Sequence, residues 1–371
     1  MSTPEIYSPG LEGVIAGETA ISTVTGGLRY RGYPVTELAA KRSFEDVAHL
    51  LLHGELPTGP QLAEFQKRLA TAQRLPGQVS SFLKEAPKAA ASMDVLRTAV
   101  SMLALYDPET GANSRAANLR KAERLLAQIP VALAEHYRAT KGLPPVPAKP
   151  ELGFAANLLL MVSGKAPNAF DCKAFDVSLI LYAEHEFNAS TFTARVVCST
   201  QSDLHSSIVA AIGALKGPLH GGANEKVMDV LLATGGPDKA EAWIRAAMAR
   251  KEKVMGFGHR VYKTGDVRAR VLKEYAGQAA QRAGLAKWEE AAEIVERILA
   301  QEKHLYPNLD WPAGRLYHAM GLETPLYTPF FVASRVTGWS AHVIEQLDNN
   351  RIIRPRARYT GPEERTVPPG D

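Results

Sequence analysis

The chain has 371 residues, of which 46% are hydrophobic and 22% charged, a size and composition that favour a globular protein of about two domains. Its net charge of only +4 is compatible with anionic small molecules but too small to indicate nucleic-acid binding. Two cysteines without metal-ligand spacing, and no apolar run near the roughly 20 residues that span a bilayer, predict a cytoplasmic protein with reduced thiols.

The first predicted elements lie in the N-terminal part of the chain. Residues 13–28 are rich in threonine and glycine and are the only segment that favours a small β-hairpin. A helix is predicted next, because an apolar face is formed by Phe44, Val47, Leu50 and Leu51. Ser43 can cap this helix and Gly54 can end it. A capping box at residues 58–61 then begins a second helix.

Helical spacing continues along the rest of the chain. Apolar residues recur at this spacing in residues 208–215, 227–231, 240–248 and 291–299. The proline-rich residues 143–149 are predicted to form an exposed loop rather than a domain linker, because apolar periodicity resumes directly after them. The sequence therefore predicts an all-α fold.

Several motif-like patterns fail to support other chemistries. Glu45, His49 and His53 share a helical face, but this face lies opposite the apolar stripe and is predicted to be solvated rather than metal-binding. The His-Glu pair at residues 185–186 lacks the second histidine of a zinc-protease helix. Residues 256–261 lack the third glycine of a dinucleotide loop and follow no predicted strand. We therefore expect neither a metal nor a dinucleotide site.

Three loops bounded by glycine or proline display ionisable side chains. The first, residues 216–225, presents His220 between small residues at the start of a helix, where the helix dipole disfavours the imidazolium cation. The second, residues 256–268, displays His259 and several basic side chains. The third places Asp310 among apolar and proline residues, where loss of solvation would strengthen it as a base.

Taken singly, each of these residues has a plain structural explanation. A lone histidine near glycines is more often a partly buried structural residue than a catalytic one. Arg268 could be a surface charge in the first turn of a helix, and Asp310 could be an ordinary helix cap. Together, the three loops predict an anion-binding site that contains acid–base groups.

The motifs also resemble those of one known family. Gly-Pro-Leu-His-Gly-Gly-Ala-Asn-Glu at residues 217–225 and Gly-Phe-Gly-His-Arg-Val-Tyr-Lys-Thr at residues 256–264 resemble the two histidine motifs of citrate synthase. Pro-Asn-Leu-Asp at residues 307–310 resembles its aspartate motif. Further matches in the same order extend the resemblance to about residues 9–361. It implies a helical enzyme that joins acetyl-CoA to oxaloacetate.

The resemblance implies a catalytic role for one residue of each loop. Asp310 would be the general base that removes a proton from the methyl group of acetyl-CoA. His220, as a neutral donor, would hold the thioester oxygen and stabilise the enol, since a carboxylate alone cannot usefully deprotonate a thioester. His259 would hydrogen-bond the ketone of oxaloacetate and protonate the alkoxide as the new bond forms.

Oxaloacetate carries two carboxylates and therefore requires several fixed cations. The resemblance assigns this role to Arg268, Arg335 and Arg354, with His185 assisting. His185 follows Val177 and Leu181 at helical spacing, so it is expected just beyond the end of the helix whose inner face they form. In the family, the arginine matching Arg354 comes from the partner subunit, which implies a homodimer with shared active sites.

The resemblance also implies how CoA and the domains are arranged. Acetyl-CoA would be a co-substrate, with no permanently bound cofactor, and its CoA contacts are expected from Val254, Gly256, Gly258, Lys263 and Arg356. For Arg356, as for Arg358, a solvated basic tail is an equally good explanation. A large helical domain is expected over residues 1–217 and 324–371, with a small domain over residues 218–323 that closes over oxaloacetate.

Alternatives remain at this level. After the aspartate, the family usually has two aromatic-type residues and then serine or alanine, whereas this chain has Trp-Pro-Ala-Gly beside the expected acetyl pocket. A 2-methylcitrate synthase would use the same residues with propionyl-CoA, and one methylene is worth only about 1–3 kcal/mol of discrimination. A catalytically silent relative is disfavoured because His220, His259 and Asp310 are all present. Neither nucleic acid nor a membrane is expected as a partner.

Overall fold

The computed structural model describes residues 7–259, 261–262 and 264–369. These residues form sixteen α-helices and a small three-stranded sheet, so the predicted all-α fold is confirmed. The α-helices are α1 (Val35–Lys41), α2 (Phe44–His53), α3 (Gly59–Ala72), α4 (Gly77–Glu85), α5 (Ser92–Tyr106), α6 (Arg115–Thr140), α7 (Phe154–Ser163), α8 (Ala169–Tyr182), α9 (Ala189–Ser199), α10 (Leu204–Leu215), α11 (Ala223–Thr234), α12 (Pro237–Ala249), α13 (Val267–Arg282), α14 (Ala286–Lys303), α15 (Asp310–Ala319) and α16 (Tyr327–Asp348). The short elements are the 3-10 helices η1 (Pro9–Leu11) and η2 (Thr324–Leu326), and the strands β1 (Ser22–Thr23), β2 (Arg29–Tyr30) and β3 (Tyr33–Pro34).

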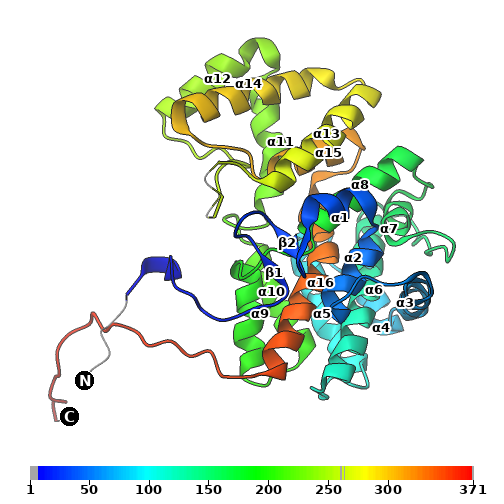
Figure 1. The fold of residues 1–371 in the computed structure, drawn as a ribbon, viewed down its shortest axis with the longest axis vertical. Coiled ribbons are helices and arrows are strands. Elements are labelled where there is room, and N and C mark those ends of the chain that lie inside the picture. Colours follow the sequence, from blue (N-terminus) through cyan, green and yellow to red (C-terminus); the bar gives the residue numbers. More distant parts are fainter. Residues whose placement is uncertain (1–6, 260, 263, 370–371) are drawn as a thin grey trace.

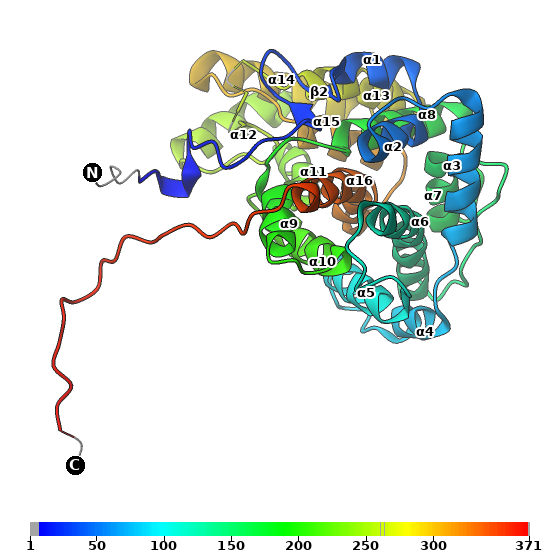
Figure 2. The same ribbon diagram turned by 60° about the horizontal axis from the view of Figure 1, so that its bottom comes forward.

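Helix α16 forms the centre of the larger group of helices. It runs among α2, α5, α6, α8, α9 and α10 and is buried along nearly its whole length (Figure 2). A helix that is apolar on most sides must be covered by other helices, and Phe330, Val336 and Trp339 have no exposed surface. Neither α16 nor any other described helix is long and apolar enough to cross a membrane.

Helices α11 to α15 form a second group, which lies above the first in Figure 1. The pairs α12–α14, α13–α15 and α11–α15 pack against each other, and their apolar faces meet around buried residues such as Ile244, Leu272 and Val295. The chain enters this group through the turn at residues 216–222 and leaves it through residues 320–326. Two of the three loops predicted to carry the site therefore belong to this group, and the third leads into it.

The local signals around α2 act as predicted. The Ser43 hydroxyl accepts the Asp46 N–H at 3.2 Å, and the Asp46 carboxylate accepts the Ser43 N–H at 3.0 Å. Gly54 ends the helix with a left-handed φ of 97°. Residues 143–149 form a largely exposed loop outside any helix, also as predicted.

The predicted hairpin was displaced toward the C-terminus. Strand β1 lies within residues 13–28, but it pairs Ser22 with Tyr30 and Thr23 with Arg29, beyond the predicted end. The register depends on a tertiary contact: Tyr30 is fully buried, and its hydroxyl donates to the carbonyl oxygen of Glu184 at 2.9 Å. Nothing in the local sequence could signal that distant partner.

The solvated face predicted for α2 was wrong, because other helices cover it. Glu45 and His49 are only 4% and 8% exposed. The Glu45 carboxylate accepts the N–H of Phe154 at the start of α7 at 2.8 Å. Nδ1 of His49 lies 2.9 Å from the carbonyl oxygen of Glu55, and Nε2 of His53 lies 3.1 Å from the Glu123 carboxylate. Among the described residues, no group of three or more His, Cys, Asp or Glu side chains could hold a metal ion.

Candidate active site

Two loops of the smaller helical group pair with each other and hold the predicted catalytic residues in register. Gly258 N–H donates to the Tyr306 carbonyl at 2.9 Å, and Asn308 N–H donates to the Gly256 carbonyl at 2.9 Å. The Asn308 side-chain amide adds a bond to the Gly258 carbonyl at 3.0 Å. His259 follows the first loop directly and Asp310 ends the second. The backbone pairing therefore fixes the two residues relative to each other.

Gly256 is required where this loop passes Trp311. Its φ is +87°, a left-handed conformation that disfavours side chains, and an added Cβ would lie 2.9 Å from the indole ring. The indole cannot easily move away, because Trp311 is fully buried and its Nε1–H donates to Glu296 at 2.8 Å. Glycine thus permits the loop to pack closely against the N-terminal end of α15, the helix that begins at Asp310.

Asp310 is the first residue of α15 rather than its cap. Its N–H donates to the Asn308 side chain at 3.0 Å, and its Oδ1 accepts the Tyr182 hydroxyl at 2.8 Å. Loss of solvation raises the pKa of the carboxyl to about 6, although the Tyr182 hydrogen bond and Arg268 act in the opposite direction. A carboxylate with this pKa is ionised at neutral pH and is a stronger base than an exposed one.

His220 lies in the turn between α10 and α11 and is held in the neutral form. Burial, followed by the positive charge of Arg335, lowers the pKa of its imidazole to about 3. The Ser190 hydroxyl lies 2.8 Å and the Ser190 N–H 3.4 Å from Nε2. Because a backbone N–H can only donate, Nε2 is an acceptor and the ring proton belongs on Nδ1. The sequence predicted a neutral histidine here, but it assigned the cause to the helix dipole.

His259 has the opposite tautomer. Its Nδ1 accepts the N–H groups of Val261 at 3.0 Å and Tyr262 at 3.3 Å, so in the neutral ring the proton is on Nε2. The His259 ring centroid lies 5.1 Å from that of His185 and 4.5 Å from that of Tyr262. The backbone of its own turn therefore prepares His259 as an Nε2–H donor.

His185 lies just beyond α8, as predicted, and is 7% exposed. Val177 and Leu181, expected to form the inner face of that helix, are fully buried. Its Nε2 is 2.9 Å from the Tyr262 hydroxyl. Burial, then the charge of Arg268, lowers the pKa of His185 well below its usual value, so this ring is neutral too.

Two guanidinium groups are buried at the same place. Arg335, on α16, is 1% exposed, donates through Nε to the Tyr182 carbonyl at 2.5 Å and lies 4.6 Å above the Phe331 ring. Burial, together with the nearby charge of Arg268, lowers the pKa of Arg335 to about 10. Arg268 is 5% exposed, so it is not the surface charge that remained an alternative.

Arg268 is held at the start of α13 by a bidentate ion pair. Its Nε and Nη2 donate to the two Asp266 oxygens at 3.0 and 2.7 Å. Burial opposes the charge of Arg268, but Asp266 more than offsets this effect and raises the pKa of the guanidinium. The charges of Arg268 and Arg335 both lower the pKa of Asp310 and of His185, and the charge of Arg335 also lowers the pKa of His220. These side chains therefore share one electrostatic environment.

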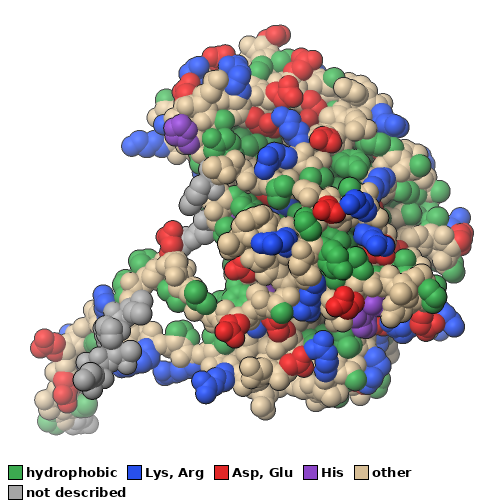
Figure 3. Space-filling model, viewed as in Figure 1, with side chains coloured by type: hydrophobic (Ala, Val, Ile, Leu, Met, Phe, Trp, Pro, Cys, Tyr) green, Lys and Arg blue, Asp and Glu red, His purple; other side chains and the backbone are tan. Residues whose placement is uncertain are grey.

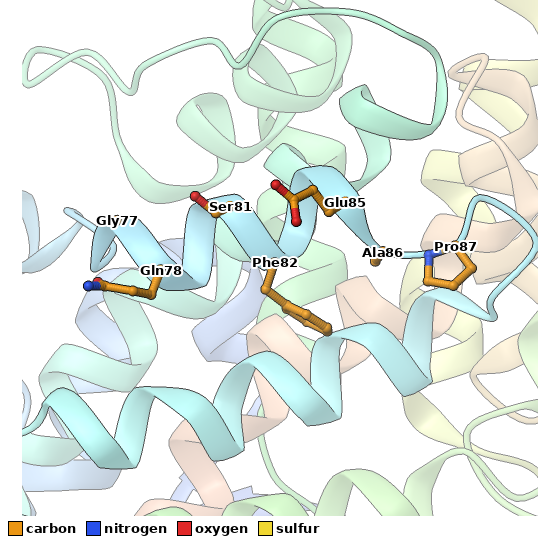
Figure 4. A pocket seen from close by; sticks show the side chains of 7 residues that line it. All are labelled: Gly77, Gln78, Ser81, Phe82, Glu85, Ala86 and Pro87. Atoms are coloured by element: carbon orange, nitrogen blue, oxygen red, sulfur yellow. The ribbon is translucent and has the colours of Figure 1, made fainter.

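The remaining predicted residues lie in different parts of the chain. Val254 is 9% exposed and, with Gly256 and Gly258, lies in the paired loop. Arg354 and Arg356 are exposed on the C-terminal extension, which leads away from the helices (Figures 1 and 2) and is not gathered with the other residues within one chain. Lys263 lies outside the described residues. The surface hollow in Figure 4 belongs to α4 and the turn after it, and none of the predicted residues lines it.

Sequence reasoning missed four side chains that shape the site. Asp266 lies in the second predicted loop and Ser190 lies outside all three loops, and neither was given a role in the site. Tyr262 and Tyr182 were given no role. Their partners His185 and Asp310 are 77 and 128 positions away, so only the folded chain reveals these pairs.

Comparison with known proteins decides the family. The model of the citrate synthase C-terminal domain family matches residues 10–356. The chain belongs to the citrate synthase family. A citrate synthase from Mycolicibacterium smegmatis is 46% identical, with 98% of this chain and 97% of that protein covered. A 2-methylcitrate synthase from Mycobacterium tuberculosis is 47% identical, with 97% and 92% covered.

A solved structure agrees over the same extent. It is the ternary complex of carboxymethyl coenzyme A and oxaloacetate with citrate synthase from Thermoplasma acidophilum, which is 33% identical. The TM-score is 0.94, and 99% of each chain is covered. Like its relatives, the chain is an enzyme that transfers an acyl group.

The contact between Gly256 and Trp311 yields a prediction about activity. Gly256→Ala should lower kcat by about tenfold or more, because the added methyl group must displace either the indole or the loop that carries His259. The matched control is Gly277→Ala on α13, where nothing lies within 4 Å of the added Cβ. Steady-state kinetics and thermal unfolding of both variants test this, and normal turnover by Gly256→Ala would contradict it.

Proposed function

We propose that the chain is a citrate synthase, which condenses acetyl-CoA with oxaloacetate and water to give citrate and CoA. The observation that carries the proposal is the grouping of Asp310, a neutral His220 and an Nε2–H donor on His259 around two buried guanidinium groups. The Mycolicibacterium smegmatis citrate synthase and the two ligands of the Thermoplasma acidophilum complex support these substrates.

The first step would form the enolate of acetyl-CoA. Asp310 takes a proton from the methyl carbon, and the electron pair of that C–H bond moves toward the thioester oxygen. The Nδ1–H of His220 donates a hydrogen bond to this oxygen as negative charge develops there. A neutral donor suits this task, because its proton stays on the imidazole while the enolate forms.

The second step would form the carbon–carbon bond. The enolate carbon attacks the ketone of oxaloacetate, and the thioester carbonyl forms again. The Nε2–H of His259 donates to the ketone oxygen as it becomes an alkoxide and then passes its proton to that oxygen. Arg268 and Arg335, with His185, bind the carboxylates, and Arg354 of a second copy completes the set. Water then hydrolyses the citryl-CoA thioester and releases citrate and CoA.

The two groups of helices support a division into two domains. We assign residues 1–217 and 324–371 to a large domain and residues 218–323 to a small one. The hydrogen bond between His185 and Tyr262 joins the two, so closure of the small domain would bring His259 against bound oxaloacetate. CoA would bind at the paired loop, with Lys263 and Arg356 near its phosphates.

The assembly would be a homodimer in the cytoplasm. Arg354 lies on the exposed C-terminal extension, from which it could enter the site of a second copy. The two free thiols are compatible with a reducing compartment such as the cytoplasm. On the face in Figure 3, basic and acidic side chains are interspersed rather than gathered in a basic stripe. Such a surface does not favour nucleic acid as a partner.

A 2-methylcitrate synthase that uses propionyl-CoA is the second candidate. The two curated relatives carry the two different names at nearly equal identity, 46% and 47%. Trp311 and Pro312, in the first turn of α15 directly after Asp310, are the place where an acyl preference would differ, because they would border the proposed acyl pocket.

Acyl preference is tested by the specificity constant. We expect kcat/KM with acetyl-CoA to exceed that with propionyl-CoA by about tenfold or more, the scale of one methylene in a fitted pocket. Thiol release with each acyl-CoA and oxaloacetate measures both. A preference for propionyl-CoA would select the second candidate, and no thiol release with either would refute both.

Asp310→Asn should lower kcat by at least about 100-fold, because it keeps the shape of the side chain and removes its basicity. Oxaloacetate binding, followed by calorimetry, should change little, since the guanidinium groups are intact. Near-normal turnover in this variant would show that another group is the base.

The shared site predicts complementation between inactive chains. Dimers of Arg354→Ala alone or His259→Ala alone should be inactive, whereas a mixed dimer contains one site with neither substitution. About half of the wild-type turnover per mixed dimer is expected, which activity measurements on purified, differently tagged mixed dimers would detect. Inactive mixed dimers would argue against a site built from two chains.

A further inference from the structure

We propose that Tyr182 is a positioning residue for the general base: its hydroxyl holds the Asp310 carboxylate and leaves Oδ2 as the oxygen that takes the substrate proton. This inference rests on the proposed function, because it refines the role of Asp310 in the condensation. It assigns a role to a residue on α8, in the larger group of helices, that acts on a base at the start of α15, in the smaller group.

The Tyr182 side chain is held in place by α16. It is 1% exposed, and its ring centroid lies 4.1 Å from that of Phe331 on α16. Its own carbonyl oxygen accepts the Arg335 Nε–H at 2.5 Å. The hydroxyl donates to Oδ1 of Asp310 at 2.8 Å, and the Asn224 side chain also interacts with it.

The hydrogen-bond inventory of Asp310 then distinguishes its two oxygens. Oδ1 accepts the tyrosine hydroxyl, whereas none of the described residues donates a hydrogen bond to Oδ2. A phenol donates one proton and stabilises the oxygen that accepts it. Considering donors from the described part of the chain, Oδ2 is therefore the more basic oxygen and the one that would receive the proton. Burial raises the pKa of Tyr182 well above its usual value, so this donor stays protonated.

The other charges around Asp310 show why a neutral donor matters here. Arg268 on α13 and Arg335 on α16 favour the carboxylate, whereas Asp266, which precedes α13, disfavours it. Loss of solvation is the largest influence and raises the pKa to about 6, and the Tyr182 hydrogen bond is the largest opposing one. Without the hydroxyl, the carboxyl would be protonated over part of the neutral range and could not act as a base.

The direction of the pH effect on turnover follows because Asp310 acts as a base only when it is ionised. Turnover should fall as the pH drops through about 6, where Asp310 takes up a proton. Tyr182→Phe removes the hydrogen bond and so raises the pKa, which moves this acid limb of the kcat profile upward by about one pH unit. Near pH 6 the variant should be about fivefold slower than wild type, and at pH 9 within about twofold of it.

Tyr317→Phe is the matched control. Tyr317 is as buried as Tyr182 and also acts electrostatically on Asp310, but its hydroxyl pairs with Ser178 at 3.0 Å instead. This variant also loses a buried hydroxyl, yet its acid limb should stay at the wild-type position. A purely structural role for Tyr182 would lower kcat by the same factor at every pH, and that result would overturn the inference.

A titration that needs no turnover separates this inference from the proposed function. The infrared carbonyl band of the protonated Asp310 carboxyl is identified by its loss in Asp310→Asn and followed against pH in the wild type and in Tyr182→Phe. A band that titrates about one unit higher in Tyr182→Phe supports the inference even if neither acyl-CoA is condensed, a result that would refute only the proposed function. Identical titrations in an active enzyme would overturn the inference alone.

Discussion

The site depends on keeping two like charges out of water. Arg268 and Arg335 are almost fully buried and close enough that Arg268 helps to lower the pKa of Arg335. Burying two cations together is unfavourable unless negative groups compensate. Asp266 neutralises Arg268 through two hydrogen bonds, and Glu184 favours the charge of Arg335 only from a distance. The pair is left with a need for further negative charge, which a small dicarboxylate would supply.

The same two cations influence the protonation of their neighbours. Burial is the main cause of the lowered pKa of His220 and of His185, and Arg335, joined at His185 by Arg268, lowers it further, so both imidazoles remain neutral. The cations also oppose the effect of burial on Asp310, which keeps its carboxylate available. A neutral donor and an ionised base can therefore coexist close together. Replacing the arginines by apolar residues would leave the imidazoles neutral, but it would remove the positive charges that favour the ionised form of Asp310.

Much of this arrangement could be predicted from the sequence, but the reasons differ between residues. The capping of α2 by Ser43 and its end at Gly54 are local, so their signals lie within a few positions. The loops of His220, His259 and Asp310 were identified because long, ordered motifs carry them. The sequence around Arg268 could not show whether this residue is a surface charge or a buried site residue, since its burial depends on residues far along the chain.

Long-range packing also explains what was missed. Glu45 and His49 were expected in water because the helix pattern reports only which face is apolar, not whether a polar face is covered. The β1–β2 register depends on Tyr30 reaching Glu184. Tyr182 lies in the last turn of α8 like any core residue, and its hydroxyl acquires a partner only when the two groups of helices meet.

The position of α16 has a consequence for biosynthesis. This helix fills the centre of the larger helical group and carries Arg335, yet it is the last helix among the described residues to leave the ribosome. Until it emerges, the earlier helices that surround it must leave apolar surface uncovered. The buried Arg335 and the helix that completes the core therefore emerge together. A nascent chain would need protection from aggregation until almost its full length had been translated.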